Sequence, residues 1–102
     1  MKETLRLDSP ANETMPYECV EEFELCGVPI SAGQKMGINI LARHLDPKEW
    51  EEPLKFIPER FDPESKFYLT PNGNKRDATS FVPFSQGLRN CPGQIFFIKL
   101  LF

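Results

Sequence analysis

The sequence predicts a single small domain in which short helices at both ends flank a turn-rich middle with short strands. The chain has 102 residues, which is enough for at most one domain with a modest core. Ten prolines and six glycines favour an irregular path with few long regular elements. Both ends carry good helix-forming residues in incomplete patterns, so we expect the chain to begin and to end inside a helix.

The first elements are predicted to be a helix and then short strands. Residues 2–8 read KETLRLD, and Pro10 disfavours a helical Ser9, so this segment is the end of a helix. Residues 21–40 alternate apolar and other positions around Gly27, which predicts a hairpin of short strands. The same period continues through Ile38 and Ile40 and predicts a third strand.

The second half is predicted to be mostly irregular until its last residues. Asp46 precedes Pro47, as in a capped helix start, and we expect a helix of one or two turns that ends at Pro53. Residues 58–79 predict a packed meander followed by an exposed loop at 72–77, because proline, asparagine and glycine are dense there. From Gln94 onward the apolar run predicts the first turns of a buried helix, too short to span a bilayer.

The charge distribution argues against nucleic acid as a partner. Twelve Lys and Arg against fifteen Asp and Glu give a net charge of −3, and the charges are mixed along the chain. No apolar stretch follows Met1, so we expect neither a signal peptide nor a membrane segment in this chain. The cellular location stays open.

The cysteines do not predict a disulfide framework. There are three, Cys19, Cys26 and Cys91, in a chain without a secretory signal, and this favours a reducing compartment. Together with His44 they could in principle form a zinc site with three thiolates and one imidazole. That alternative lacks the short paired spacing that zinc sites usually have.

The run FVPFSQGLRNCPGQ at residues 81–94 is the most informative part of the chain. It contains Phe84, Gly87, Arg89, Cys91 and Gly93 in the order FxxGxRxCxG, and it resembles the haem-thiolate loop of cytochromes P450. The resemblance implies that Cys91 is the axial thiolate ligand of the haem iron. It also implies that Phe84 shields the sulfur, that the glycines let the backbone approach the porphyrin, and that Arg89 binds a propionate.

A second pattern is similar to the P450 family and concerns the scaffold. Glu3 and Arg6 form an ExxR pair on one helix face, and residues 58–61 read PERF. By this resemblance Glu3, Arg6 and Arg60 make a structural salt-bridge network that fixes the meander and hence the loop around Cys91. Alone, an ExxR pair is a weak signal, because most such pairs are solvated ion pairs.

The only histidine, His44, lies in the run RHLDPKEW, which is similar to a P450 pattern in which a histidine approaches a haem propionate. A surface or turn histidine that caps a local carbonyl is the alternative reading. Trp50 and Phe56 are predicted to be packing anchors.

The resemblance runs from Glu3 to Phe102 and implies that residues 1–102 are a single partial domain, the proximal haem side of the mainly α cytochrome P450 fold. It implies haem b (iron protoporphyrin IX) as cofactor, a redox partner such as a P450 reductase, and oxidation of a small organic substrate by one oxygen atom of O₂. Full-length relatives are often anchored at the endoplasmic reticulum. The chain departs from the family pattern in two places. Residues 12–20, NETMPYECV, contain no basic residue, and Ser85 stands where the family often has glycine.

The same resemblance predicts no catalytic residue within this chain, because the central helix with the acid–alcohol pair for oxygen activation is not encoded. We therefore expect the chain alone to be inactive. The alternatives are a stand-alone module that binds haem or a partner without catalysis, and a non-functional remnant.

Overall fold

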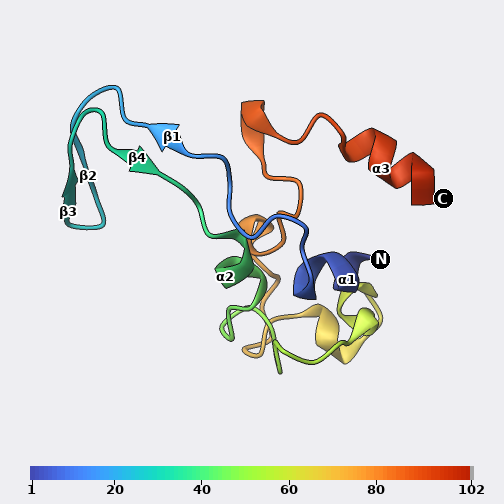
Figure 1. Cartoon of the computed structure of the whole chain (residues 1–102). Coiled ribbons are helices and arrows are strands. Elements are labelled where there is room, and N and C mark those ends of the chain that lie inside the picture. Colours follow the sequence, from blue (N-terminus) through green and yellow to red (C-terminus); the bar gives the residue numbers. More distant parts are fainter. Residues whose placement is uncertain (102) are drawn as a thin grey trace.

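The computed structural model describes residues 1–101 (Figure 1). The α-helices are α1 (Lys2–Leu7), α2 (Ile40–His44) and α3 (Gln94–Leu101), and the strands are β1 (Tyr17–Glu18), β2 (Phe23–Leu25), β3 (Val28–Ile30) and β4 (Lys35–Met36). Single turns of 3₁₀-helix are η1 (Pro58–Phe61), η2 (Lys66–Tyr68), η3 (Ala78–Ser80) and η4 (Gly87–Arg89). The elements are short, as the proline and glycine content predicted.

The predicted N-terminal helix is confirmed as α1. It ends where the amide of Asp8 donates to the carbonyl of Thr4, just before Ser9 and Pro10. Its inward face carries Glu3, Leu5 and Arg6, all of which are buried. A helix of this length gains little stability by itself, so its packing against α2 and η1 must hold it in place.

The predicted hairpin is also confirmed. Phe23 of β2 lies opposite Ile30 of β3, and the connection is a two-residue turn at Cys26 and Gly27 with φ of 52° and 80°. In Figure 1 the β1–β4 ladder leads away from the helices and ends in this hairpin.

The third strand was predicted at the wrong place. β4 lies earlier, at Lys35–Met36, and pairs antiparallel with β1. Ile38 is outside it, and Ile40 begins α2, because the side chain of Asn39 accepts a hydrogen bond from the amide of Ala42 at 2.8 Å and caps that helix.

The helix predicted after Asp46 is wrong as well. The carbonyl of Asp46 accepts from the amides of Glu49 and Trp50, which closes a single turn. The chain then takes a positive φ of 47° at Glu52, and this ends any helical path before Pro53. The helix of this region is α2, which precedes Asp46.

The core centres on Trp50, which is 1% exposed and packs with Phe61 and Phe81. Trp50 is therefore a packing anchor as predicted, whereas Phe56 is 59% exposed and is not one. The predicted meander is confirmed at η1 and η2, where turns replace regular structure.

The last helix, α3, forms where the sequence predicted it but is not buried by the described residues. Ile95, Phe96 and Leu100 are exposed by 69%, 71% and 71%. An open cavity of about 420 Å³ lies between α1, residues 81–87 and α3, and its wall does not include Cys91. Within residues 1–101, no helix combines the length and the apolar character needed to cross a membrane.

Candidate functional site

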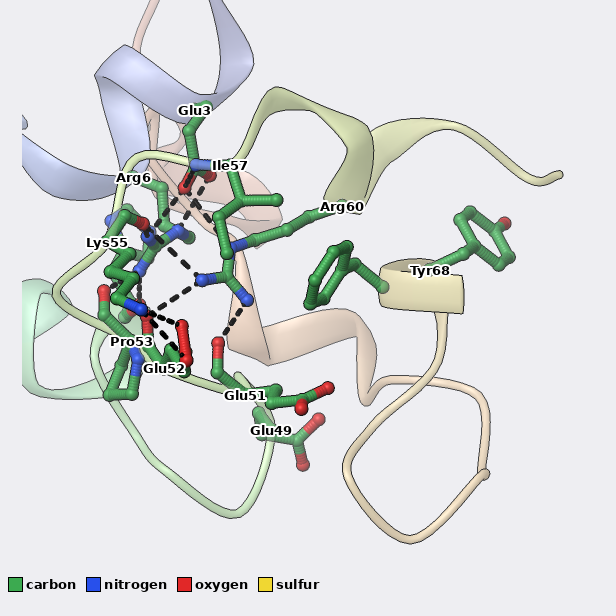
Figure 2. Close-up of polar contacts among 12 residues, drawn as sticks. Glu3, Arg6, Glu49, Glu51, Glu52, Pro53, Lys55, Ile57, Arg60 and Tyr68 are labelled. Atoms are coloured by element: carbon green, nitrogen blue, oxygen red, sulfur yellow. Dashed lines mark hydrogen bonds and ion pairs between the residues drawn. The ribbon is translucent and has the colours of Figure 1, made fainter. Parts of the chain in front are cut away.

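A buried ion network of Glu3, Arg6 and Arg60 joins α1 to the meander (Figure 2). Arg6 binds the Glu3 carboxylate through two parallel hydrogen bonds, Nε to Oε2 at 2.8 Å and Nη2 to Oε1 at 2.7 Å. Arg60 Nε donates to Oε1 of the same carboxylate at 3.2 Å, and the amide of Ile57 does so at 3.0 Å. The exposed fractions of Glu3, Arg6 and Arg60 are 2%, 0% and 0%. The structure therefore brings the three predicted scaffold residues together.

The two guanidinium groups also bind backbone carbonyls of the segment before η1. Arg6 Nη1 donates to the carbonyls of His44 and Pro53 at 2.9 and 2.7 Å. Arg60 Nη2 donates to the carbonyl of Glu52 at 2.8 Å, and Arg60 Nη1 to that of Glu51. Because five donors sit on each rigid fork, each arginine can fix several turns of the chain at once.

The electrostatics of the network follow from its composition of one carboxylate and two guanidinium groups. Burial raises the pKa of Glu3, but the Arg6 hydrogen bond, the Ile57 amide and the charges of Arg6 and Arg60 outweigh it, so the pKa is lowered. Burial lowers the pKa of Arg60, and the nearby Arg6 charge adds to this. The surplus positive charge is solvated by backbone carbonyls in place of water.

Arg76 belongs to this scaffold although sequence reasoning missed it. It lies half-buried with its guanidinium 4.3 Å from the Trp50 ring centre. Its Nε donates to the carbonyl of Glu49 at 3.0 Å and its Nη1 to that of Arg60 at 3.1 Å. Further hydrogen bonds reach the carbonyls of three meander residues, Phe67, Tyr68 and Leu69. A lone arginine in a polar loop carries no periodic signal, which is why the sequence placed it in solvent.

The cysteine loop, residues 81–93, holds Cys91 at the surface. Its path needs a positive φ at Ser85 (61°) and at Gly87 (79°). The amide of Cys91 donates to the carbonyl of Phe84 at 2.8 Å, which closes the loop. Cys91 is exposed and free, three residues before the start of α3.

The surroundings of Cys91 fit a large flat cofactor bound through sulfur. A Cβ on Gly93 would lie 3.6 Å from Cys91 Sγ, in ordinary van der Waals contact, so the missing side chain leaves this side of the sulfur uncovered. The Phe84 ring packs edge-on against Phe97 of α3, with ring centres 5.4 Å apart. Arg89 lies exposed on the same loop. A soft sulfur donor, a glycine beside it and a cation on the same loop are features that suit a haem with its propionates.

His44 has a different place from the predicted propionate contact. Its side chain is in the core with an exposed fraction of 0%, and Nε2 accepts a hydrogen bond from the amide of Val82 at 3.0 Å. The ring also lies 5.3 Å from that of Phe81. The ring is not open to an outside carboxylate, and the alternative of a surface or turn histidine at a local carbonyl does not describe it either, because its partner is the amide of Val82, 38 residues away.

The zinc alternative finds no support in the described residues. Among residues 1–101, no three His, Cys, Asp or Glu side chains come together as a metal site. Cys19 is buried beside β1, Cys26 is exposed in the hairpin turn and Cys91 is in the cysteine loop.

Comparison with known proteins decides the family. A family model described as Cytochrome P450 matches residues 1–98. The chain belongs to the cytochrome P450 family. Its structure is also similar to a solved P450, retinoic acid bound cyanobacterial CYP120A1, with a TM-score of 0.84 and 29% identity over 98% of this chain and 22% of that one. The fold class predicted from the sequence is thereby confirmed.

Curated P450 relatives match the chain along nearly all of its length. Berbamunine synthase from Berberis stolonifera is 37% identical over 101 residues, which is 99% of this chain and 20% of the relative. Cytochrome P450 71BT1 from Catharanthus roseus is 42% identical over 98 residues, 96% of this chain and 18% of the relative. The chain thus spans about a fifth of the length of these relatives.

Proposed function

We propose that this chain provides the thiolate side of the haem site of a cytochrome P450 monooxygenase. The observation that carries the proposal is the cysteine loop, in which an exposed Cys91 lies beside the open space at Gly93 and ahead of α3. Cys91 would ligate the iron of haem b, and Arg89 would bind a propionate. Gly87 and Gly93, which have no side chains, would let the loop lie close beneath the porphyrin.

The other residues of the chain would orient the ligand and keep water away from it. Phe84, held against Phe97, would cover one side of the sulfur. The buried ion network would fix the meander against which the loop packs. When bound, haem b supplies the oxidising chemistry, the transfer of one oxygen atom of O₂ to a small organic substrate with electrons from a redox partner such as a P450 reductase.

The proposed role assigns no catalytic residue to this chain, so we expect no turnover from it alone. Relatives carry names such as 5-epiaristolochene 1,3-dihydroxylase, from Nicotiana tabacum, which is 38% identical over 102 residues. Such names support an oxidative role for the whole protein. The substrate that a name states is the substrate of that relative. By family analogy we propose that the whole protein is anchored at the endoplasmic reticulum.

The test is a haem titration of the purified chain, with the spectrum of the ferrous–CO complex as readout. We expect a thiolate-type Soret band for the wild type, its loss in Cys91→Ala and its retention in Cys26→Ala. Cys26 is the matched control, because it too is a free and exposed cysteine. A thiolate band that survives in Cys91→Ala would refute the assignment of the ligand.

A stand-alone haem-binding module without catalysis is the second candidate. It is favoured by the buried ion network, whose charged groups find their partners within this chain. Haem binding by the chain together with an absence of turnover in the presence of a reductase would support it. A chain with no cooperative unfolding transition would instead be a non-functional remnant.

A further inference from the structure

His44 connects the buried ion network to the cysteine loop through two different parts of the same residue. Its backbone carbonyl accepts from Arg6 Nη1 at 2.9 Å, and its ring Nε2 accepts from the amide of Val82 at 3.0 Å. The first hydrogen bond lies in the core, because the exposed fractions of Arg6 and His44 are 0%, and the second joins the buried His44 ring to the half-buried Val82.

Val82 stands at the start of the loop that presents Cys91. The carbonyl of Val82 accepts from the amide of Ser85 at 3.0 Å, and this turn sets the direction of Phe84. The carbonyl of Phe84 then accepts from the amide of Cys91 at 2.8 Å. The bonded path therefore runs from the histidine ring through the first turn of the loop to the backbone of the cysteine.

We propose that His44 is a positioning residue that fixes the cysteine loop by accepting the hydrogen bond of the Val82 amide. The proposal rests on the proposed function of Cys91 as haem ligand, but the geometry that it concerns exists in the chain itself. His44 would act on the ligand only through the loop.

The protonation state of the ring agrees with this role. Because Nε2 accepts from Val82, the neutral ring carries its proton on Nδ1, which has no hydrogen-bond partner among the described residues. Burial lowers the pKa of His44, and the Arg6 cation of α1 adds to this, while the backbone of Arg6 and Leu5 near the ring opposes it. The neutral acceptor form is therefore favoured at neutral pH, and on the side that faces the loop the ring meets Phe81 and the amide of Val82.

Two substitutions of His44 distinguish the effect of its hydrogen-bond acceptor from the effect of the packing of its ring. His44→Phe keeps an aromatic ring beside Phe81 but offers no acceptor to Val82, whereas His44→Gln replaces Nε2 by a neutral amide oxygen. The readout is amide hydrogen exchange of Val82 and Cys91 in the apo chain. The amide of Ile57, which is bonded to Glu3, is the reference for the ion network.

We expect His44→Phe to speed exchange at Val82 and Cys91 by at least about tenfold relative to Ile57, and His44→Gln to restore most of the protection. In the haem-loaded chain the thiolate-type ferrous–CO band should fall in the phenylalanine variant and return in the glutamine variant. Unchanged exchange at Val82 and Cys91 in His44→Phe would overturn the proposal. Equal loss at Ile57, Val82 and Cys91 in both variants would also overturn it, because His44 would then only pack the core.

Failure of the proposed function is distinguishable from failure of this inference. If the wild type binds no haem through sulfur, the role of Cys91 is refuted, yet the exchange of the Val82 amide still reports whether His44 holds the loop. If haem binds through Cys91 equally well in all His44 variants and exchange is unchanged, only the positioning role of His44 is refuted.

Discussion

Replacing Glu3 by alanine is the sharpest test of how this chain holds its shape. The substitution removes the carboxylate that accepts from Arg6, Arg60 and the amide of Ile57. It leaves two guanidinium groups with exposed fractions of 0% and no counter-charge between them. Breaking a buried ion pair by removing one partner costs about 3–5 kcal/mol, because the remaining charge stays buried and unpaired.

The total stability available to the chain makes this loss decisive. A natural domain has about 0.05–0.15 kcal/mol of stability per residue, which gives about 5–15 kcal/mol for a chain of 102 residues. The small apolar core, Leu5, Cys19, Ile30, Ile40 and Trp50, places this chain at the lower end. We therefore expect Glu3→Ala to be largely unfolded under conditions in which the wild type is folded.

The assay is urea unfolding followed by circular dichroism, in a stabilising osmolyte so that both states of each variant can be measured. Glu59→Ala is the matched control, because Glu59 is a glutamate of the same PERF turn as Arg60 but is exposed and has no side-chain hydrogen bond in the described residues. The reasoning is refuted if Glu3→Ala lowers the unfolding free energy no more than Glu59→Ala does.

Two further predictions concern Arg76 and the acid side of the stability curve. Arg76→Leu should lower the unfolding free energy by about 1.5–3 kcal/mol, since its charged hydrogen bonds to meander carbonyls are lost, while Lys75→Leu on the exposed neighbour should have little effect in the same urea assay. Stability should fall as the pH drops below the ordinary His44 pKa of 6.5, because the folded pKa is lowered and the unfolded chain binds the proton more readily. Glu3 adds a second fall below 4.5, as its lowered pKa in the folded state gives stability that is lost on protonation. When the unfolding free energy is measured against pH, the fall that begins near 6.5 should be absent in His44→Gln. If that variant shows the same fall as the wild type, the fall is not due to His44.

The parts of the fold that could be predicted are those that depend on neighbours in sequence. Helix-forming residues predict α1, and a two-residue turn at Gly27 predicts the hairpin. A proline and a glycine ahead of an apolar run predict the start of α3. The signal for α2 was also local, an asparagine cap before Ile40, but the strand period of the preceding residues concealed it. The Asp-Pro pair gave a false helix start, because the chain makes a single turn after Asp46 and then takes a positive φ at Glu52, whose carbonyl binds the distant Arg60.

The candidate site divides in the same way. The cysteine loop and the ExxR and PERF patterns are contiguous strings, so family resemblance alone could identify them. Arg76 acts through several hydrogen bonds to backbone carbonyls and the ring of His44 through one to the amide of Val82, and a backbone partner leaves no residue type to recognise. Sequence therefore identified the charged partners of Glu3 but not Arg76 or the hydrogen bond of the His44 ring.

The surplus charge of the ion network explains why so much of the segment between α2 and η1 is irregular. One carboxylate cannot neutralise both Arg6 and Arg60, so the remaining donors need oxygen atoms from the backbone. A helix or a strand would use its own carbonyls, and a segment of turns leaves those of Glu51, Glu52 and Pro53 free to face the arginines. The irregular segment between α2 and η1 thus supplies the oxygen atoms that the two buried guanidinium groups need, and Arg6 also binds the carbonyl of His44, whose ring reaches the loop of Cys91.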